Sequence, residues 1–113
     1  NTVTEMVLVL TKALNISRVN PALVKRSGYP EANLINAPLA RFVHLVGADG
    51  KASDTLGLIA DALKEERSLV GLRSILLAQD GTNLPVVLTF VPMRDGNQVI
   101  GGVVTLRSDP EPN

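Results

Sequence analysis

Two Asp-Gly pairs in the second half of the chain, each set between two apolar runs, constrain the fold more than any other feature. Asp80-Gly81 separates residues 72–79 from residues 84–93, and Asp95-Gly96 separates the latter run from residues 99–106. An Asp-Gly pair flanked by apolar residues is the strongest short-range signal for a β-hairpin. The second half is therefore predicted to form a three-stranded antiparallel meander.

The first half begins with two short apolar runs, residues 6–10 and 16–19. Asn15 lies between them and tolerates a left-handed backbone, so these runs are predicted to pair as a further hairpin. Two strands, a group of helices and then three strands give an α+β fold, in which the helices pack on one face of an antiparallel sheet.

Helix boundaries between the two groups of strands follow from asparagine, proline and glycine positions. Asn20 can cap a helix over residues 21–27, Pro21 suits its first position, and Gly28 suits its exit. Pro30 is expected to open a short helical turn, and Asn36 with Pro38 to start another that runs through Val43. Further along, we expect the longest helix to begin at Ser53 or Asp54 and continue through Leu63, because apolar residues recur there at helical spacing.

Composition limits the classes of function. The chain has 113 residues, no net charge at neutral pH and no cysteine. We expect one domain over residues 1–107, followed by a polar linker over residues 108–113 that leads to an output domain. A neutral chain gives no electrostatic basis for binding nucleic acid or an anionic membrane, and no apolar run is long enough to span a bilayer. A cytoplasmic location suits a chain without cysteine.

The order of several short motifs resembles PAS domains. The motifs are residues 16–22 (ISRVNPA), 27–29 (SGY), 79–82 (QDGT), 94–96 (RDG) and 100–104 (IGGVV). The resemblance covers roughly residues 5–107, with departures at Thr11, at Asn36 (where glycine is common) and at residues 107–110. It implies a five-stranded antiparallel sheet in the spatial order two, one, five, four, three, with helices enclosing a cavity over one face.

The same resemblance implies a sensing and relay module within a multidomain signalling protein. A sensor histidine kinase of a two-component system is the favoured parent, and a diguanylate cyclase or a transcriptional regulator is the alternative. Two other classes remain open: a dimerisation scaffold without a ligand, and a small adaptor with an unrelated helix-backed sheet, such as a profilin-like fold.

The catalytic inventory is poor, so the domain itself is not expected to be an enzyme. His44 is the one histidine, and no serine lies in a recognisable nucleophile turn. No haem or flavin is expected: His44 is placed at the end of a short helix, and light-sensing flavin chemistry needs a cysteine that this chain lacks. No metal site is expected, because acidic residues and the histidine do not fall at ligand spacing.

A small apolar or amphipathic ligand is the remaining candidate for the cavity. Its expected contacts come from the helices and from one alternating set of the fourth strand: Phe42, Val43, Leu56, Ile59, Leu63, Val87, Thr89 and Val91. The competing interpretation is that these side chains only fill the core.

In residues 86–91 both alternating sets of side chains are apolar. An antiparallel sheet with one face exposed to solvent needs only one apolar set, so the second apolar set indicates that the other face is also covered. A homodimer formed through the outer sheet face is therefore expected. Because Thr89 is polar and could contact a ligand, its set is assigned to the cavity. The other set, Val86, Leu88 and Phe90, is assigned to the dimer face.

Overall fold

The structure, a computed structural model, describes residues 5–47 and 55–109. Its elements in chain order are β1 Met6–Thr11, β2 Ile16–Val19, α1 Pro21–Ser27, α2 Glu31–Leu34, α3 Leu39–Phe42, β3 His44–Gly47, α4 Thr55–Lys64, β4 Leu69–Leu77, β5 Asn83–Asp95 and β6 Gln98–Ser108.

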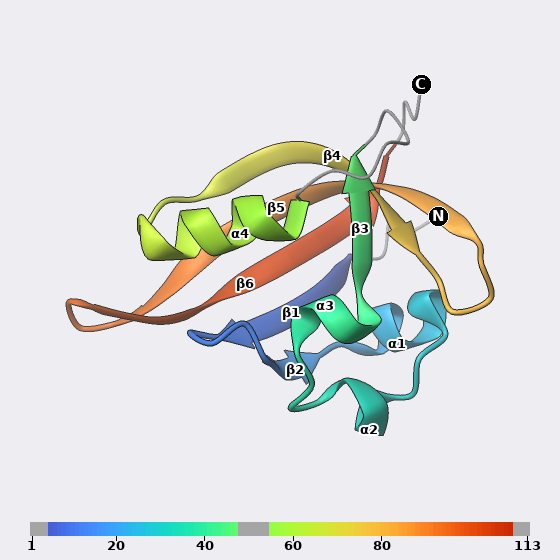
Figure 1. Cartoon of the computed structure of the whole chain (residues 1–113), viewed down its shortest axis with the longest axis horizontal. Coiled ribbons are helices and arrows are strands. Elements are labelled where there is room, and N and C mark those ends of the chain that lie inside the picture. Colours follow the sequence, from blue (N-terminus) through green and yellow to red (C-terminus); the bar gives the residue numbers. More distant parts are fainter. Residues whose placement is uncertain (1–4, 48–54, 110–113) are drawn as a thin grey trace.

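All strands belong to one antiparallel sheet in the order β2-β1-β6-β5-β4-β3 (Figure 1). The predicted α+β class, the helix-backed sheet and the relative order of the five expected strands are confirmed. The described part of the chain adds a sixth strand, β3, at the sheet edge beside β4.

The unpredicted strand β3 changes the setting of His44. The helix expected to run through Val43 ends at Phe42, and Val43 is extended, with φ −107° and ψ 110°. His44 then pairs with Leu77 of β4 instead of ending a helix. With only four residues, β3 is too short for its alternation to separate it from the end of the preceding helix.

The β1–β2 hairpin is confirmed, but its left-handed residue is Leu14, with φ 66°, and not Asn15. Asn15 forms an isolated antiparallel bridge with Pro38. Its backbone is therefore held extended by a segment distant in sequence, and the turn places its left-handed residue one position earlier.

Asp80-Gly81 lies within a hairpin connection, whereas in the second pair Asp95 ends β5 and only Gly96 lies in the turn. Residues 78–82 join β4 to β5, and Gly96-Asn97 forms the two-residue turn between β5 and β6. In the first connection, hydrogen bonds from the Thr82 side chain and from the Thr82 N–H (2.9 Å) hold the pKa of the exposed Asp80 carboxyl below its ordinary value. Gly81 follows with φ 91°, a conformation that glycine adopts without strain.

The Asn20 cap of α1 is confirmed, and it also ties the helix to the sheet. Its Oδ1 accepts hydrogen bonds from the backbone N–H of Leu23 (3.1 Å) and of Val7 (3.0 Å). Its Nδ2 donates to the carbonyl of Glu5 at 2.7 Å. The cap alone is worth about 0.5–2 kcal/mol, and the two bonds to the β1 side fix where α1 leaves the sheet.

The remaining helix starts are confirmed in part. Pro30 precedes α2 as predicted, whereas Pro38, and not Asn36, is the N-cap of α3. Asn36 has φ 69° and donates its N–H to the Ile16 carbonyl at 2.7 Å, so it serves a left-handed turn. The predicted starts of α4, Ser53 and Asp54, lie outside the described residues.

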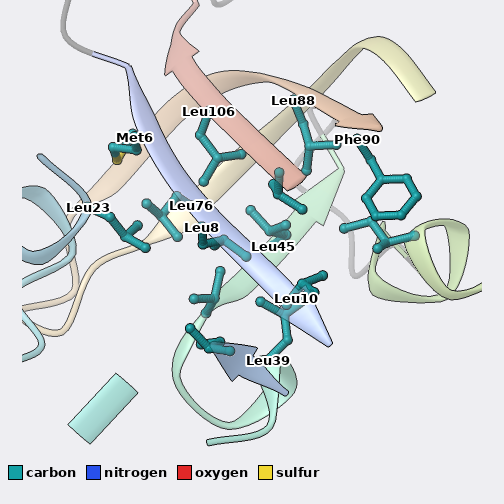
Figure 2. Packing of buried hydrophobic residues seen from close by; sticks show 14 of the residues in the cluster. Met6, Leu8, Leu10, Leu23, Leu39, Leu45, Leu76, Leu88, Phe90 and Leu106 are labelled. Atoms are coloured by element: carbon teal, nitrogen blue, oxygen red, sulfur yellow. The ribbon is translucent and has the colours of Figure 1, made fainter. Parts of the chain in front are cut away.

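One hydrophobic core lies between the sheet and the helices (Figure 2). Met6, Leu8 and Leu10 of β1 alternate with half-buried residues and point into it. Helix α1 contributes Leu23, and α4 contributes Ile59. All helical side chains in the core meet the same sheet face, so the helices cover that face.

The assignment of the two β5 faces is wrong and must be reversed. Val86, Leu88 and Phe90 are fully buried in the core. Leu88 pairs with Leu106 and Phe90 pairs with Val104, which are also buried, so the register of β6 places this set inward. Val87, Thr89 and Val91 consequently lie on the outer face.

Candidate functional site

The outer face of the sheet carries a row of valines across its centre. Val9 of β1 pairs with Val103 of β6, and Val103 pairs with Val91 of β5. We call Val9, Val103 and Val91 the outer row. Val9 and Val103 are half-buried, and Val91 is 47% exposed. Three β-branched apolar side chains thus stand side by side on a face that the described helices do not cover.

Polar and basic residues frame the outer row. Thr105 lies between Val7 and Thr89 in the next row of paired positions. Three arginines lie around these rows: Arg18 pairs with Val9, and Arg73 and Arg107 each pair with Val87. A depression of about 170 Å³, large enough to receive one side chain, is lined by Val7, Val9, Arg18, Val19 and Asn20. An apolar centre within a polar rim is the usual anatomy of a protein–protein interface.

The inner face brings together five of the eight predicted ligand contacts. Val43, Ile59 and Leu63 are buried in the core, while Phe42 and Leu56 are half-buried against it. The Phe42 ring also makes an edge-to-face contact with Tyr29, with centroids 5.5 Å apart. The other three predicted contacts, Val87, Thr89 and Val91, lie on the opposite side of the sheet.

A polar side chain on the inner face was missed in the sequence. Ser74 of β4 is 1% exposed, and its hydroxyl has no hydrogen-bond partner among the described residues. It pairs with Gly47 of β3 and with Val86 of β5. Its position two residues from Leu72 and two from Leu76 places it in the inward alternating set, and this pattern could have identified it.

The described residues offer little for metal or haem chemistry. His44 is exposed on the edge strand β3. Across residues 5–47 and 55–109, no group of three or more His, Asp or Glu side chains is arranged to hold a metal ion. The expected absence of haem, flavin and metal stays a prediction.

No helix within these ranges is long and apolar enough to cross a membrane.

The end of β6 is bound to two other elements. Ser108 Oγ accepts a hydrogen bond from Arg26 of α1 at 2.9 Å. Asp109 forms an ion pair with Arg73 of β4 at 2.9 Å, and its N–H donates to the Pro85 carbonyl at 3.0 Å. The first two residues of the predicted linker are therefore joined to the body of the domain.

Comparison with solved structures identifies the architecture as the PAS fold. The PAS domain of a protein from Colwellia psychrerythraea has a TM-score of 0.73 and 18% sequence identity, and the match covers 93% of this chain and 86% of that one. The sequence itself matches no protein-family model and no curated protein.

Two further structures show how varied the proteins with this fold are. The PAS domain of nitrogen regulation protein NR(II) from Vibrio parahaemolyticus has a TM-score of 0.70 and 20% identity, over 93% of this chain and 89% of that one. The light-state dimer of the fungal blue-light photoreceptor Vivid has a TM-score of 0.70 and 14% identity, over 96% and 81%. At these identities the likeness concerns the fold, and function must be argued from the sites.

Proposed function

We propose that this domain is a PAS-type module for signal sensing and relay, that it has no catalytic activity of its own, and that it works by self-association through the outer row. The observation that carries the proposal is the outer row itself: Val9, Val103 and Val91 occupy paired positions on the face that the described helices leave uncovered. A similar structure, that of Vivid, is a dimer.

The outer row suits an isologous contact between two copies of the chain. In such a contact the same patch is used by both copies, so one dimer buries the three valines of each copy. Removing the remaining exposed surface of each valine from water is worth roughly 1 kcal/mol, and the framing arginines and threonines keep the rim soluble. The patch can therefore support an association that is reversible, as a signalling contact requires.

Strand β6 connects this surface to the end of the domain. Val103 lies in the middle of the outer row, and Ser108 and Asp109, at the end of the same strand, are bound to Arg26 and Arg73. A change in packing on the outer face would act directly on β6, at Val103. The relay is thus proposed to run along β6, with α1 and β4 as its anchor points.

Sedimentation of the purified domain tests this proposal. We expect the wild-type protein to self-associate reversibly, and Val103→Glu to weaken association by at least about tenfold, since each dimer would bury two unpaired carboxylates. Leu58→Glu is the matched control, because Leu58 is an apolar side chain on α4 that is 41% exposed and lies outside the outer row. A monomeric wild-type protein, or equal association of both variants, contradicts the proposal.

Ligand sensing is the second candidate, and the unpartnered Ser74 hydroxyl favours it. A buried hydroxyl without a partner costs stability, and a small ligand with one polar group would satisfy it while its apolar part lies against the hydrophobic core. If the domain binds no ligand, it is a ligand-free dimerisation scaffold, the alternative that the sequence leaves open.

Mass spectrometry of organic extracts from the purified domain separates these alternatives. With a ligand, we expect a small molecule to co-purify with the wild-type protein and to be several-fold depleted in Ser74→Val. An empty wild-type protein, together with a Ser74→Val variant of higher thermal stability, would leave Ser74 as an unsatisfied core hydroxyl and favour the scaffold.

The parent protein is proposed to be a sensor histidine kinase acting in the cytoplasm, on the sequence resemblance alone. The similar structures include both a nitrogen regulation protein and a blue-light photoreceptor, so the fold is shared by proteins with different inputs. The full-length gene tests this proposal: a kinase domain encoded beside this one would support it, and a diguanylate cyclase or DNA-binding domain there would contradict it.

A further inference from the structure

A groove of about 870 Å³ lies away from the outer row, where three segments distant in sequence meet. These segments are the β1–β2 turn, the C-terminal end of α4, and the tip of the β5–β6 hairpin, which projects beyond the other strands (Figure 1). The groove is lined by Lys12, Leu14, Ala60, Leu63, Lys64, Glu66, Asn97, Gln98, Val99 and Ile100.

The projecting hairpin explains why the groove exists. Pairing of β1 with β6 stops at Thr11 and Gly101, and pairing of β4 with β5 stops at Leu69 and Phe90. The hairpin tip, residues 91–100, therefore extends beyond both neighbouring strands. The space between this tip and the rest of the domain is left open.

An ion pair joins the two main walls of the groove. Arg94 of the hairpin contacts Glu66, just after α4, at 3.1 Å. Glu66 ends the helix in a left-handed conformation, with φ 58°. Its N–H and that of Arg67 donate to the carbonyls of Leu63 and Ala62, so two of the last helix carbonyls are already satisfied. The partial negative charge at the C-terminal end of α4 is therefore smaller, and it repels an anion in the groove less.

The lining of the groove is amphipathic and carries excess positive charge. Leu14 is half-buried and Ile100 is 44% exposed, so these two side chains offer most of the apolar surface, and the buried side chains of Leu63 and Val99 also line the groove. Two exposed lysines also line it, Lys12 and Lys64. Among the ion pairs of residues 5–47 and 55–109, neither lysine takes part, whereas the one acidic side chain in the lining is paired with Arg94.

We propose that this groove binds an anionic amphiphile, a carboxylate on a short alkyl chain. The carboxylate would lie between Lys12 and Lys64, and the chain would cover Ile100 and the apolar residues beside it. A volume of about 870 Å³ lies within the range of small-molecule sites. A cationic amphiphile is disfavoured by the two lysines, and a purely apolar molecule leaves their charges unused. The groove shares no lining residue with the outer row, and Ser74 does not line it.

Titration with octanoate, followed by methyl and amide NMR, tests the proposal. We expect saturable shifts at Leu14, Leu63, Val99 and Ile100. Lys12→Ala and Lys64→Ala should each raise the Kd roughly two- to fivefold, the loss expected for one exposed charge pair. Lys25→Ala removes an exposed lysine of α1 that does not line the groove, so it should leave the Kd unchanged.

Two comparison ligands separate charge from chain length. Butyrate keeps the carboxylate but has too short a chain, and octylamine has the chain with the opposite charge; both should bind more weakly than octanoate. The proposal is overturned if octylamine binds as well as octanoate, if the Lys12→Ala/Lys64→Ala double variant keeps the wild-type Kd, or if the shifts map elsewhere. Val103→Glu should bind octanoate normally, so the failure of either proposal can be distinguished from failure of the other.

Discussion

Leu88→Glu is expected to leave the domain unfolded at neutral pH. Leu88 is fully buried in the middle of β5, between its pairing partners Leu72 and Leu106. A carboxylate there would lose its hydration with no basic partner, and the leucine packing would be lost as well. The combined cost is several kcal/mol or more, comparable with the 5–15 kcal/mol that typically stabilises a whole domain.

Val87→Glu, one residue earlier, is the matched control. Val87 lies on the outer face between Arg73 and Arg107, so a glutamate there meets solvent and two positive charges. Circular dichroism and urea unfolding should show a folded Val87→Glu protein and an unfolded Leu88→Glu protein. The opposite result would mean that the two faces of β5 are exchanged.

Gly102→Ala is expected to destabilise the domain by about 3 kcal/mol, an overpacking cost at the upper end of the usual range. A Cβ on Gly102 would lie 2.5 Å from Phe90 Cζ and 3.1 Å from the Val91 carbonyl oxygen. Phe90 is fully buried in the core, so a displacement of its ring requires the core side chains around it to shift as well. The glycine is needed because an aromatic ring lies directly over the neighbouring strand.

A double-mutant cycle with Phe90→Leu tests that cause. The smaller side chain removes the ring atoms that the new methyl group meets, so Gly102→Ala should cost much less in the Phe90→Leu background. Urea unfolding of the four proteins gives the coupling energy. Equal costs in both backgrounds would show that the destabilisation comes from the backbone and not from the ring.

Local sequence signals predicted the parts of the fold that depend on local chemistry. The Asp-Gly pairs lie at both hairpin connections, and Asn20, Pro21 and Gly28 mark the limits of α1 because each meets a backbone requirement at its own position. The order of these motifs was sufficient to predict the PAS-like architecture, which the similar structures confirm.

The errors occurred where distant contacts decide the structure. Both alternating sets of β5 are apolar, so the pattern carries no information on which set faces the helices, and the register with β6 decides it. Strand β3 exists because β4 offers it an edge. Likewise Leu14 takes the left-handed position because Asn15 is bridged to Pro38.

In the candidate sites, too, local sequence signals predicted some features, and contacts between distant segments decided the others. Ile59 and Leu63 of α4 are buried in the core, because helix periodicity identifies a buried stripe. Val43 is buried as well, although it is extended and follows α3. The outer row was predicted as a surface but with the wrong side chains. The groove beside α4 was not predicted, since its walls come from three segments whose meeting depends on how far the β5–β6 hairpin projects.

The most direct test of the outer row is an isotope-filtered NOE experiment on a mixture of labelled and unlabelled protein. Such an experiment detects only contacts between different copies of the chain. We predict intermolecular NOEs to the methyl groups of Val9, Val91 and Val103, and their loss in Val103→Glu. Intermolecular NOEs confined to other surfaces, or none at a concentration where sedimentation detects association, would contradict the proposal that this sheet face is the signalling interface.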